Sequence, residues 1–380
     1  MVKRFLIFLL FIIALLALLW INPLAKKQTV STTGWEQLIP SDKVDVKVQP
    51  MKGNNNLDVT EFNGKYYLAF RTAPSHFASK KTKLYIISSG DLKTWDYEHE
   101  IHLGSDLREP RFAVFNDTLF FYFFEGGKHP LKFEPQKVWM TYLDNGHWKD
   151  KHDLQLDGFV PWRFRVRTDT LFLSAYYGKD LYNKKHVGNQ RLFYSNNGFD
   201  FLPISESPQV QEMGAEEGEF IFDQMGNLYG TLRMEGDGSM VVFAAKNNLK
   251  DWITNYSKFK YDSALLFEYK QEIYLISRRN LDGESKKSNW RLYNMIRYSF
   301  TKKKTTLFYL DKGDLTLSYI KDFPSTGDTA FPGIVPLGNG KFFLVNYSSD
   351  IHGKEKNWIK GQLGRTYLYS TIIDMEEILN

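Results

Sequence analysis

The chain of 380 residues contains no cysteine, which excludes disulfide bonds, a cysteine-linked lipid anchor and cysteine-ligated zinc. Its 8 histidines are scattered, and no glycine-rich phosphate or dinucleotide motif is present, so we expect no metal site and no cofactor. The net charge of +5 is too small to indicate a nucleic-acid partner. Long stretches with helical periodicity are lacking beyond the N-terminus, so the sequence indicates a protein built mainly from strands.

A single long apolar run stands at the N-terminus. Lys3 and Arg4 precede residues 5–21, which carry no charge, and this length suits a signal anchor better than a cleaved signal peptide. We therefore predict an N-terminal hydrophobic helix in residues 1–24, acting as signal anchor or signal peptide. The expected location is the cell membrane with the folded part outside the cytoplasm, or a secreted or periplasmic form if the segment is cleaved.

A strand–turn–strand phrase recurs six times in the rest of the chain. Each copy begins with a short apolar strand, continues through a polar turn and ends in a strand rich in aromatic and aliphatic residues. The copies are residues 57–71, 109–124, 161–177, 217–233, 264–278 and 330–347. Strand-built repeats of roughly 40–50 residues are typical of β-propellers, in which the first strands of all blades converge on a central channel.

The repeats predict an all-β fold, a six-bladed β-propeller in residues 51–380. Five blades are the alternative number, and a sandwich of unrelated hairpins is the alternative architecture. Residues 25–50 are predicted to be a linker, in which the alternating residues 37–49 form a strand that closes the ring. A third strand follows most copies and leads to a turn that ends in an aromatic residue, which we expect to pack between blades: Trp95, Trp148, Phe201 and Trp252.

Charged residues recur where the copies begin or end, and these ends face the channel in a propeller. Asp58, Glu109 and Glu217 begin three of the copies and are the predicted catalytic residues, because convergent carboxylates with shifted pKa values are the acid–base apparatus of glycoside hydrolysis. For each acid the alternative is a structural ion pair with a nearby arginine. Arginine at these ends suits carboxylate or sulfate groups. The predicted substrate-binding residues are Arg71, Arg108, Arg111, Trp162, Arg163, Glu219, Arg233, Arg278 and Phe331.

The turns at residues 88–95 (SSGDLKTW) and 195–201 (SNNGFDF) look like loose Asp boxes, and through them the chain resembles the sialidase superfamily. Copy four is similar to the sialidase segment that supplies a glutamate partnering the nucleophile and, about sixteen positions later, an arginine of the carboxylate-binding triad. The resemblance implies these roles for Glu217 and Arg233. It places Arg71 like the sialidase arginine that ends the second strand of blade one, and it implies a further triad role for Arg278 or Arg279. It departs at blade one, which lacks the first triad arginine, and at Phe331, which stands where the family has its nucleophilic tyrosine.

A weaker resemblance links the chain to the five-bladed arabinanase, xylosidase and invertase propellers. It rests on Asp58, on Arg108-Glu109-Pro110 and on Glu217-Gly218-Glu219, which look like the three acidic motifs of those families. That resemblance implies that Asp58 is base or nucleophile, that Glu109 tunes the site, and that Glu217 donates the proton.

These observations predict an exported or membrane-anchored sialidase-like glycoside hydrolase that acts on an acidic or decorated glycan. The expected partners are a carbohydrate and, through the N-terminal segment, a membrane. The alternative function is a non-catalytic propeller that binds glycans or proteins, which the missing tyrosine and arginine favour.

Overall fold

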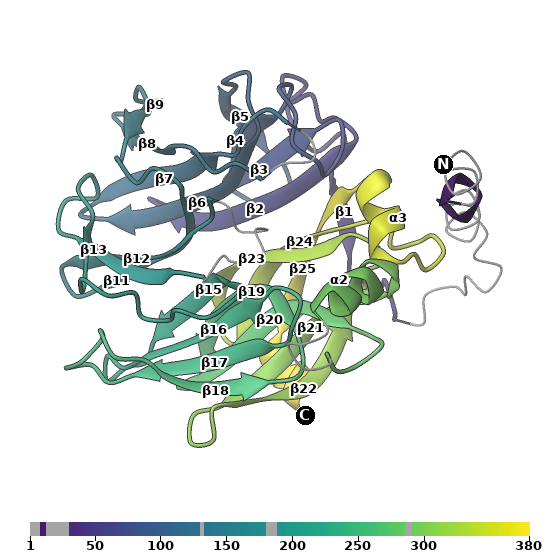
Figure 1. The fold of residues 1–380 in the computed structure, drawn as a ribbon. Coiled ribbons are helices and arrows are strands. Elements are labelled where there is room, and N and C mark those ends of the chain that lie inside the picture. The colour runs from purple at the N-terminus through teal and green to yellow at the C-terminus, as the bar shows by residue number, and fades with distance from the viewer. Residues whose placement is uncertain (1–7, 13–29, 130–132, 180–187, 286–290) are drawn as a thin grey trace.

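The computed structural model describes residues 8–12, 30–129, 133–179, 188–285 and 291–380. In this part of the chain the strands form six sheets, five with four strands and one with five (Figure 1). The innermost strands contact one another in the closed order β2, β6, β11, β15, β19, β23 and back to β2. The six-bladed propeller is therefore confirmed, and the five-bladed and sandwich alternatives are wrong.

The first three blades follow the chain. Blade one consists of β2 (Gly53–Phe62), β3 (Lys65–Ala73), β4 (Lys83–Ser89) and β5 (Asp96–Ile101). Blade two consists of β6 (Leu107–Phe115), β7 (Thr118–Glu125), β8 (Val138–Asp144), β9 (His147–Trp148) and β10 (His152–Asp153). Blade three consists of β11 (Phe159–Arg167), β12 (Thr170–Tyr177), β13 (Gln190–Ser195) and β14 (Leu202–Pro203).

The last three blades complete the ring and carry three helices. Blade four consists of β15 (Ala215–Phe222), β16 (Leu228–Met234), β17 (Ser239–Ala244) and β18 (Ile253–Ser257). Blade five consists of β19 (Tyr261–Tyr269), β20 (Glu272–Asn280), β21 (Lys303–Asp311) and β22 (Thr316–Phe323), with α2 (Arg291–Phe300) between β20 and β21. Blade six consists of β23 (Thr329–Gly338), β24 (Lys341–Ser348), β25 (Tyr367–Asp374) and β1 (Glu36–Ile39), with α3 (Trp358–Leu363) and α4 (Met375–Leu379).

Blade six joins two distant parts of the chain. β1 pairs antiparallel with β25 as the outermost strand of the sheet, so residues far apart in sequence hold the ring closed. The strand predicted within residues 37–49 overlaps β1 at residues 37–39. The predicted boundaries at residue 24, between the N-terminal segment and the linker, and at residue 50, between the linker and the propeller, stay predictions.

Residues with left-handed backbone form the tight turns between the first two strands of several blades. Asn63 and Gly64 join β2 to β3 with φ of 51° and 74°, and Asn339 and Gly340 join β23 to β24 with φ of 51° and 74°. Two consecutive positive φ angles define the turn whose twist matches that of the flanking strands, and asparagine and glycine reach them at least cost. The polar turns of the repeated phrase therefore determine these hairpins locally.

The aromatic residues that end the later turns pack against the preceding blade. The ring of Trp95 in blade one stacks on Phe343 in blade six at 6.1 Å between centroids. The ring of Phe201 in blade three lies edge-on to Tyr122 in blade two at 5.9 Å. In the turn before Trp95, the Asp91 carboxylate accepts hydrogen bonds from the backbone N–H groups of residues 93 and 94. Each such turn fastens its blade to its neighbour.

The predicted N-terminal helix falls mostly outside the described residues. Residues 8–12 are helical, whereas residues 1–7 and 13–24 are not among those described. In the described ranges we find no helix of the length and apolar character needed to cross a membrane.

Candidate functional site

A β-bulge interrupts the innermost strand of every blade close to its start. In each blade the inner strand contains one residue more than its partner strand over the same stretch. A bulge re-aims the side chain at the extra position, so six side chains are redirected at the same level of the channel. The bulges lie at Asn56, Glu109–Pro110, Trp162, Glu217–Gly218, Ser263–Ala264 and Phe331–Pro332.

Five of the bulge residues have left-handed backbone although none is glycine. The φ angles are 38° at Asn56, 51° at Glu109, 51° at Glu217, 50° at Ser263 and 64° at Phe331. Such conformations cost about 1–3 kcal/mol each and cluster at functional sites, where the surrounding fold holds them. All five residues line one pocket of about 350 Å³, which we call the bulge pocket.

The rest of the bulge pocket is polar and aromatic. Loops, inner strands, second strands and helix α3 contribute His76, Arg108, Tyr176, Glu216, Arg233, Arg278, Tyr347, Trp358 and Gln362. Hydrogen-bonding groups beside aromatic rings are the lining that a sugar ring requires, because its hydroxyls need polar partners and its C–H faces pack on rings.

Glu109 is one of three buried acids that line the bulge pocket, the others being Asp106 and Glu216. Its carboxylate accepts a hydrogen bond from the Asn56 side-chain amide at 3.0 Å and lies 3.5 Å from the guanidinium of Arg111. Burial raises the pKa of Glu109 to about 7 against the attraction of Arg111, and the charge of Glu217 adds to the rise. Glu109 can therefore hold a proton near neutral pH and donate it.

Glu217 also lines the bulge pocket, and its surroundings differ from those of Glu109. One carboxylate oxygen accepts from the Arg233 guanidinium at 2.6 Å, and the other accepts from the backbone N–H of Ser263 at 2.9 Å. Both donors stabilise the carboxylate anion. The pocket thus combines an acid of raised pKa from blade two with a blade-four carboxyl group that accepts two hydrogen bonds.

Arg233 is occupied by protein carboxylates. Four of them surround its guanidinium: Glu216 (3.1 Å), Glu217 (2.6 Å), Glu235 and Asp262 (3.6 Å). Burial holds the pKa of Glu216 well above its usual value, and its acidic neighbours raise it further. A substrate carboxylate would have to displace one of these groups to reach Arg233.

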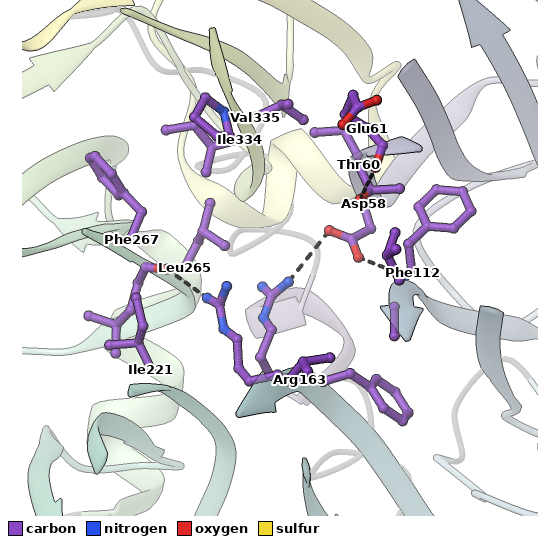
Figure 2. A pocket seen from close by; sticks show the side chains of 18 of the residues that line it. Asp58, Thr60, Glu61, Phe112, Arg163, Ile221, Leu265, Phe267, Ile334 and Val335 are labelled. Carbon is purple, nitrogen blue, oxygen red and sulfur yellow. Dashed lines mark hydrogen bonds and ion pairs between the residues drawn. The ribbon is translucent and has the colours of Figure 1, made fainter. Parts of the chain in front are cut away.

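Asp58 lies in a different pocket. It lines a pocket of about 570 Å³, the far pocket, at the end of the channel towards which the inner strands run. Figure 2 shows the Asp58 carboxylate accepting from the Phe112 backbone N–H at 2.9 Å and facing the Arg163 guanidinium at 3.5 Å. Asp58 comes two residues after the bulge at Asn56, so its side chain points into the next layer of the channel. The structure therefore brings Glu109 and Glu217 together but not Asp58.

An ion-pair cluster lies beside the far pocket, which Arg163 and Arg165 line. The Nε of Arg163 donates to Glu219 at 2.5 Å, and a second guanidinium, from Arg165, donates to the other oxygen of Glu219 at 2.8 Å. Glu219 also accepts the backbone N–H of Leu266 at 3.3 Å. Buried charges need this degree of pairing. Arg163 and Glu219, predicted to bind substrate, hold blades three and four together here.

Arg71 and Arg108 share one buried carboxylate. Asp106 accepts from Arg71 at 2.6 Å and from the Nε of Arg108 at 2.5 Å. Arg71 is fully buried and also donates to the Asn55 side-chain oxygen at 3.1 Å, so it ties blade one to blade two. Arg108 reaches the bulge pocket and donates to the backbone carbonyl of His76 at 3.0 Å.

Arg111 lies between two aromatic rings. Its guanidinium carbon is 4.4 Å from the ring centroid of Phe331 and 5.1 Å from that of Trp162. Burial and the charge of Arg163 lower the pKa of Arg111 to about 10, so the side chain is charged at neutral pH. Trp162 is itself buried, and its indole contacts Phe331 edge-on at 5.4 Å. Of these three predicted binding residues, Phe331 is the one that lines the bulge pocket.

Arg278 and Tyr347 form the blade five and blade six side of the bulge pocket. Arg278 donates to the Tyr298 hydroxyl at 2.7 Å. The Tyr347 hydroxyl donates to Asp328 at 3.0 Å, and the other oxygen of Asp328 lies 2.7 Å from Nδ1 of His76. Burial and Asp328 hold the pKa of Tyr347 well above its usual value. The hydroxyl therefore stays protonated and supplies a hydrogen bond rather than a nucleophile.

Sequence reasoning missed Asn56, Ser263 and the loop residues of the bulge pocket. Ser263 stands directly before copy five, at the place equivalent to that of Glu217 at the start of copy four. An alignment of the copies could therefore have identified Ser263. Neither α3 nor the loop that carries His76 belongs to the repeat, so nothing in the repeats pointed to them. Within the described ranges no three His, Asp or Glu side chains are placed to hold a metal ion.

No protein-family model matches the chain, and no curated protein matches its sequence. Solved structures do match. A protein of unknown function from Dyadobacter fermentans has a TM-score of 0.60 at 13% identity, over 90% of this chain and 99% of that one. The Trypanosoma rangeli sialidase in complex with sialic acid has a TM-score of 0.60 at 10% identity, over 94% of this chain and 59% of that one. The phage phi92 endosialidase has a TM-score of 0.57 at 11% identity, over 86% of this chain and 68% of that one.

At sequence identities this low, the similarity shows a common fold and nothing more. The chain spans little more than half of the Trypanosoma rangeli sialidase, so the similarity covers one part of that protein. The resemblance predicted from the loose Asp boxes and from copy four is confirmed at this level: the chain has the six-bladed propeller fold of the sialidases.

Proposed function

We propose that this protein is a glycoside hydrolase whose active site is the bulge pocket. The observation that supports the proposal is the pair formed by Glu109 and Glu217, each on a left-handed bulge of its own blade and both lining one pocket. Propeller folds similar to this one occur in sialidases, which gives the proposal its reaction class.

The two acids take complementary roles. Glu109, with its pKa raised to about 7, donates a proton to the oxygen of the scissile glycosidic bond as that bond breaks. Glu217, whose carboxyl oxygens accept from Arg233 and from the Ser263 N–H, acts on the anomeric carbon, either as nucleophile or as the base for a water molecule. In either route the departing sugar leaves with the proton of Glu109.

The substrate in this proposal is a glycan recognised through hydroxyl groups. The arginines at the bulge pocket already hold protein groups: Arg108 holds Asp106, Arg233 holds four carboxylates, and Arg278 holds Tyr298. The preference for an acidic or decorated glycan stays a prediction from the sequence. Because the arginines already pair with protein groups, we do not expect them to bind a carboxylate of the substrate.

The test is a screen of the full-length protein against chromogenic glycosides and native polysaccharides. Glu109→Gln and Glu217→Gln should each lower kcat by about 10²–10⁴-fold, because the amide keeps the shape but transfers no proton. The matched control is Glu61→Gln, which makes the same change in the far pocket and should leave kcat unaltered. Wild-type activity in both site variants would refute the proposal.

The alternative function is a non-catalytic glycan-binding propeller. One observation favours it: both oxygens of Glu217 already have partners within the protein, as in a structural ion pair. In that case calorimetry should find glycan binding that survives Glu217→Gln, while the wild type releases no product from any substrate.

We also propose that the propeller is exported and stands outside the cytoplasmic membrane. The support is the uncharged run at residues 5–21 behind Lys3 and Arg4 and the absence of cysteine. Fractionation should find the full-length protein with the membranes. A soluble mature form that begins near Lys26 would instead identify a cleaved signal peptide.

A further inference from the structure

Helix α2 presents its apolar side chains to the outside and polar ones to the protein. Leu292, Ile296 and Phe300 recur every four residues and form one stripe, with 71%, 53% and 37% of their surfaces exposed. Asn294 and Tyr298 are the buried residues of the helix. This arrangement reverses the usual pattern of a surface helix, whose apolar side faces the core.

Hydrogen bonds fix α2 in this orientation. The Asn294 amide donates to the backbone carbonyl of Gly236 at 3.0 Å. The Tyr298 hydroxyl donates to the buried Asp262 carboxylate and accepts from Arg278 at 2.7 Å. Turning the helix to bury the stripe would break all of these bonds, so the apolar side stays outward.

Helix α3 extends the same surface. α2 and α3 lie side by side (Figure 1), and the backbone N–H of Trp358 in α3 donates to the carbonyl of Thr301 just after α2 at 3.1 Å. The rings of Tyr298 and Trp358 are 5.2 Å apart. Leu363 at the end of α3 is 58% exposed. We call the surface formed by Leu292, Tyr293, Ile296, Phe300 and Leu363 the α2–α3 face.

Basic residues accompany the α2–α3 face. Residues 291–310 contain five basic and no acidic side chains, but Lys303 and Lys304 are buried, and Lys304 pairs at 2.6 Å with Glu355, the one acidic residue among residues 351–373. The basic side chains that are not buried in the two ranges are Arg291, Arg297, Lys302, Lys354, Lys356, Lys360 and Arg365. Arg297 donates to the backbone carbonyls of Asp282 and Glu284, so carbonyl groups rather than carboxylates hold its charge in the described chain. The surface therefore combines an apolar stripe with an excess of positive charge.

We propose that the α2–α3 face docks on an anionic lipid bilayer. Amphipathic helices with large apolar residues on one side and arginine or lysine beside them lie in the membrane interface, where the apolar stripe enters the acyl boundary and the basic groups meet phosphates. Two other binding partners fit the α2–α3 face less well. A second copy of the chain would bring like charges together, and a nucleic acid would leave the apolar stripe without a partner. The proposal goes beyond the glycan function.

Docking in this way places the bulge pocket beside the bilayer. Trp358 and Gln362 of α3 line that pocket, and Arg278, which also lines it, holds Tyr298 of α2. Glycans attached near the membrane surface would then meet the pocket first.

The absence of cysteine permits a clean test, because a single introduced cysteine gives one labelled site. An environment-sensitive fluorophore is attached to Ile296→Cys in the full chain, and to Ile253→Cys as control, an exposed isoleucine on β18. Both proteins are bound to vesicles of phosphatidylcholine alone or mixed with phosphatidylglycerol, which carry a quencher on the acyl chain. Both carry the same N-terminal segment, so its effect cancels.

We expect the label at 296 to shift to the blue and to be quenched in vesicles with phosphatidylglycerol, and both effects to be lost at high salt. The label at 253 should show neither effect. Leu292→Ser in the Ile296→Cys protein should reduce the quenching, with circular dichroism as the check on folding. Equal responses of the two labels, or the same response without phosphatidylglycerol, would overturn the proposal. So would a shift at 296 without lipid that grows with protein concentration, because it would identify a second copy as the occupant.

Discussion

Glu109→Gln should remove activity and at the same time stabilise the fold at alkaline pH. The folded protein holds the pKa of Glu109 at about 7, compared with a usual value of 4.5. Between these two pH values the folded state keeps a proton that the unfolded state has released, so the free energy of unfolding falls as pH rises through this window. Below it both states are protonated and the carboxyl group costs nothing. Above it the full cost of a buried anion is present.

The magnitude follows from the two pKa values. A rise from 4.5 to about 7, at about 1.4 kcal/mol for each pH unit, corresponds to about 3 kcal/mol of lost stability at pH 8. Glutamine does not titrate, and its side-chain oxygen still accepts the hydrogen bond that Asn56 donates at 3.0 Å. The variant should therefore gain up to about 3 kcal/mol over the wild type between pH 4 and pH 8.

The assay is urea unfolding at a series of pH values, with tryptophan fluorescence as the signal. The variant's advantage should grow from pH 4 to pH 7 and then level off. Glu61→Gln, the same change at a more exposed site, should show no such growth. If wild type and Glu109→Gln keep a constant difference across the series, Glu109 has an ordinary pKa and the acid role proposed for it has no physical basis.

Three further substitutions test the packing and the ion pairs. Phe331→Ala removes a ring from the cluster around Arg111 and should lower the free energy of unfolding by about 3–5 kcal/mol in urea, whereas Val166→Ala at a half-exposed site should change it by less than about 0.5 kcal/mol. Asp106→Asn removes the carboxylate that the buried Arg71 and the partly buried Arg108 share and should cost about 3–5 kcal/mol, seen as a lower Tm. Asp58→Asn should cost about 1–3 kcal/mol of stability and leave kcat within a few-fold, since its carboxylate serves channel contacts; a loss of about 10²-fold in kcat at unchanged stability would return it to the catalytic set.

The propeller followed from local information repeated six times. A hairpin with Asn63 and Gly64 at its turn forms from its own residues, because the turn needs positive φ and the strands need aromatic and β-branched side chains. Trp95 ends the turn between the third and fourth strands of its blade. From there an aromatic side chain can pack on one apolar surface, that of the preceding blade. Six copies of such a unit leave little choice of architecture, so the sequence by itself determined the fold.

The position of each charged residue along the channel was decided by the tertiary structure. One added residue in a strand changes which side chains face the channel, and the sequence does not mark where that residue is inserted. Glu109 and Glu217 stand on their bulges and reach the bulge pocket, whereas Asp58 stands two residues past the bulge at Asn56 and reaches the far pocket. The three acids looked equivalent in the sequence because each begins a copy.

The partners of the arginines were equally a matter of tertiary structure. Arg163 meets Glu219 although 56 positions separate them, and Arg71 meets Asp106 from the next blade. Neighbouring blades create these pairs, and a buried guanidinium must find such a partner because desolvation makes a lone charge too costly. The sequence by itself determined that arginine and acid recur at the channel, while only the packing of blade against blade decided which of them hold the fold and which acids face the bulge pocket.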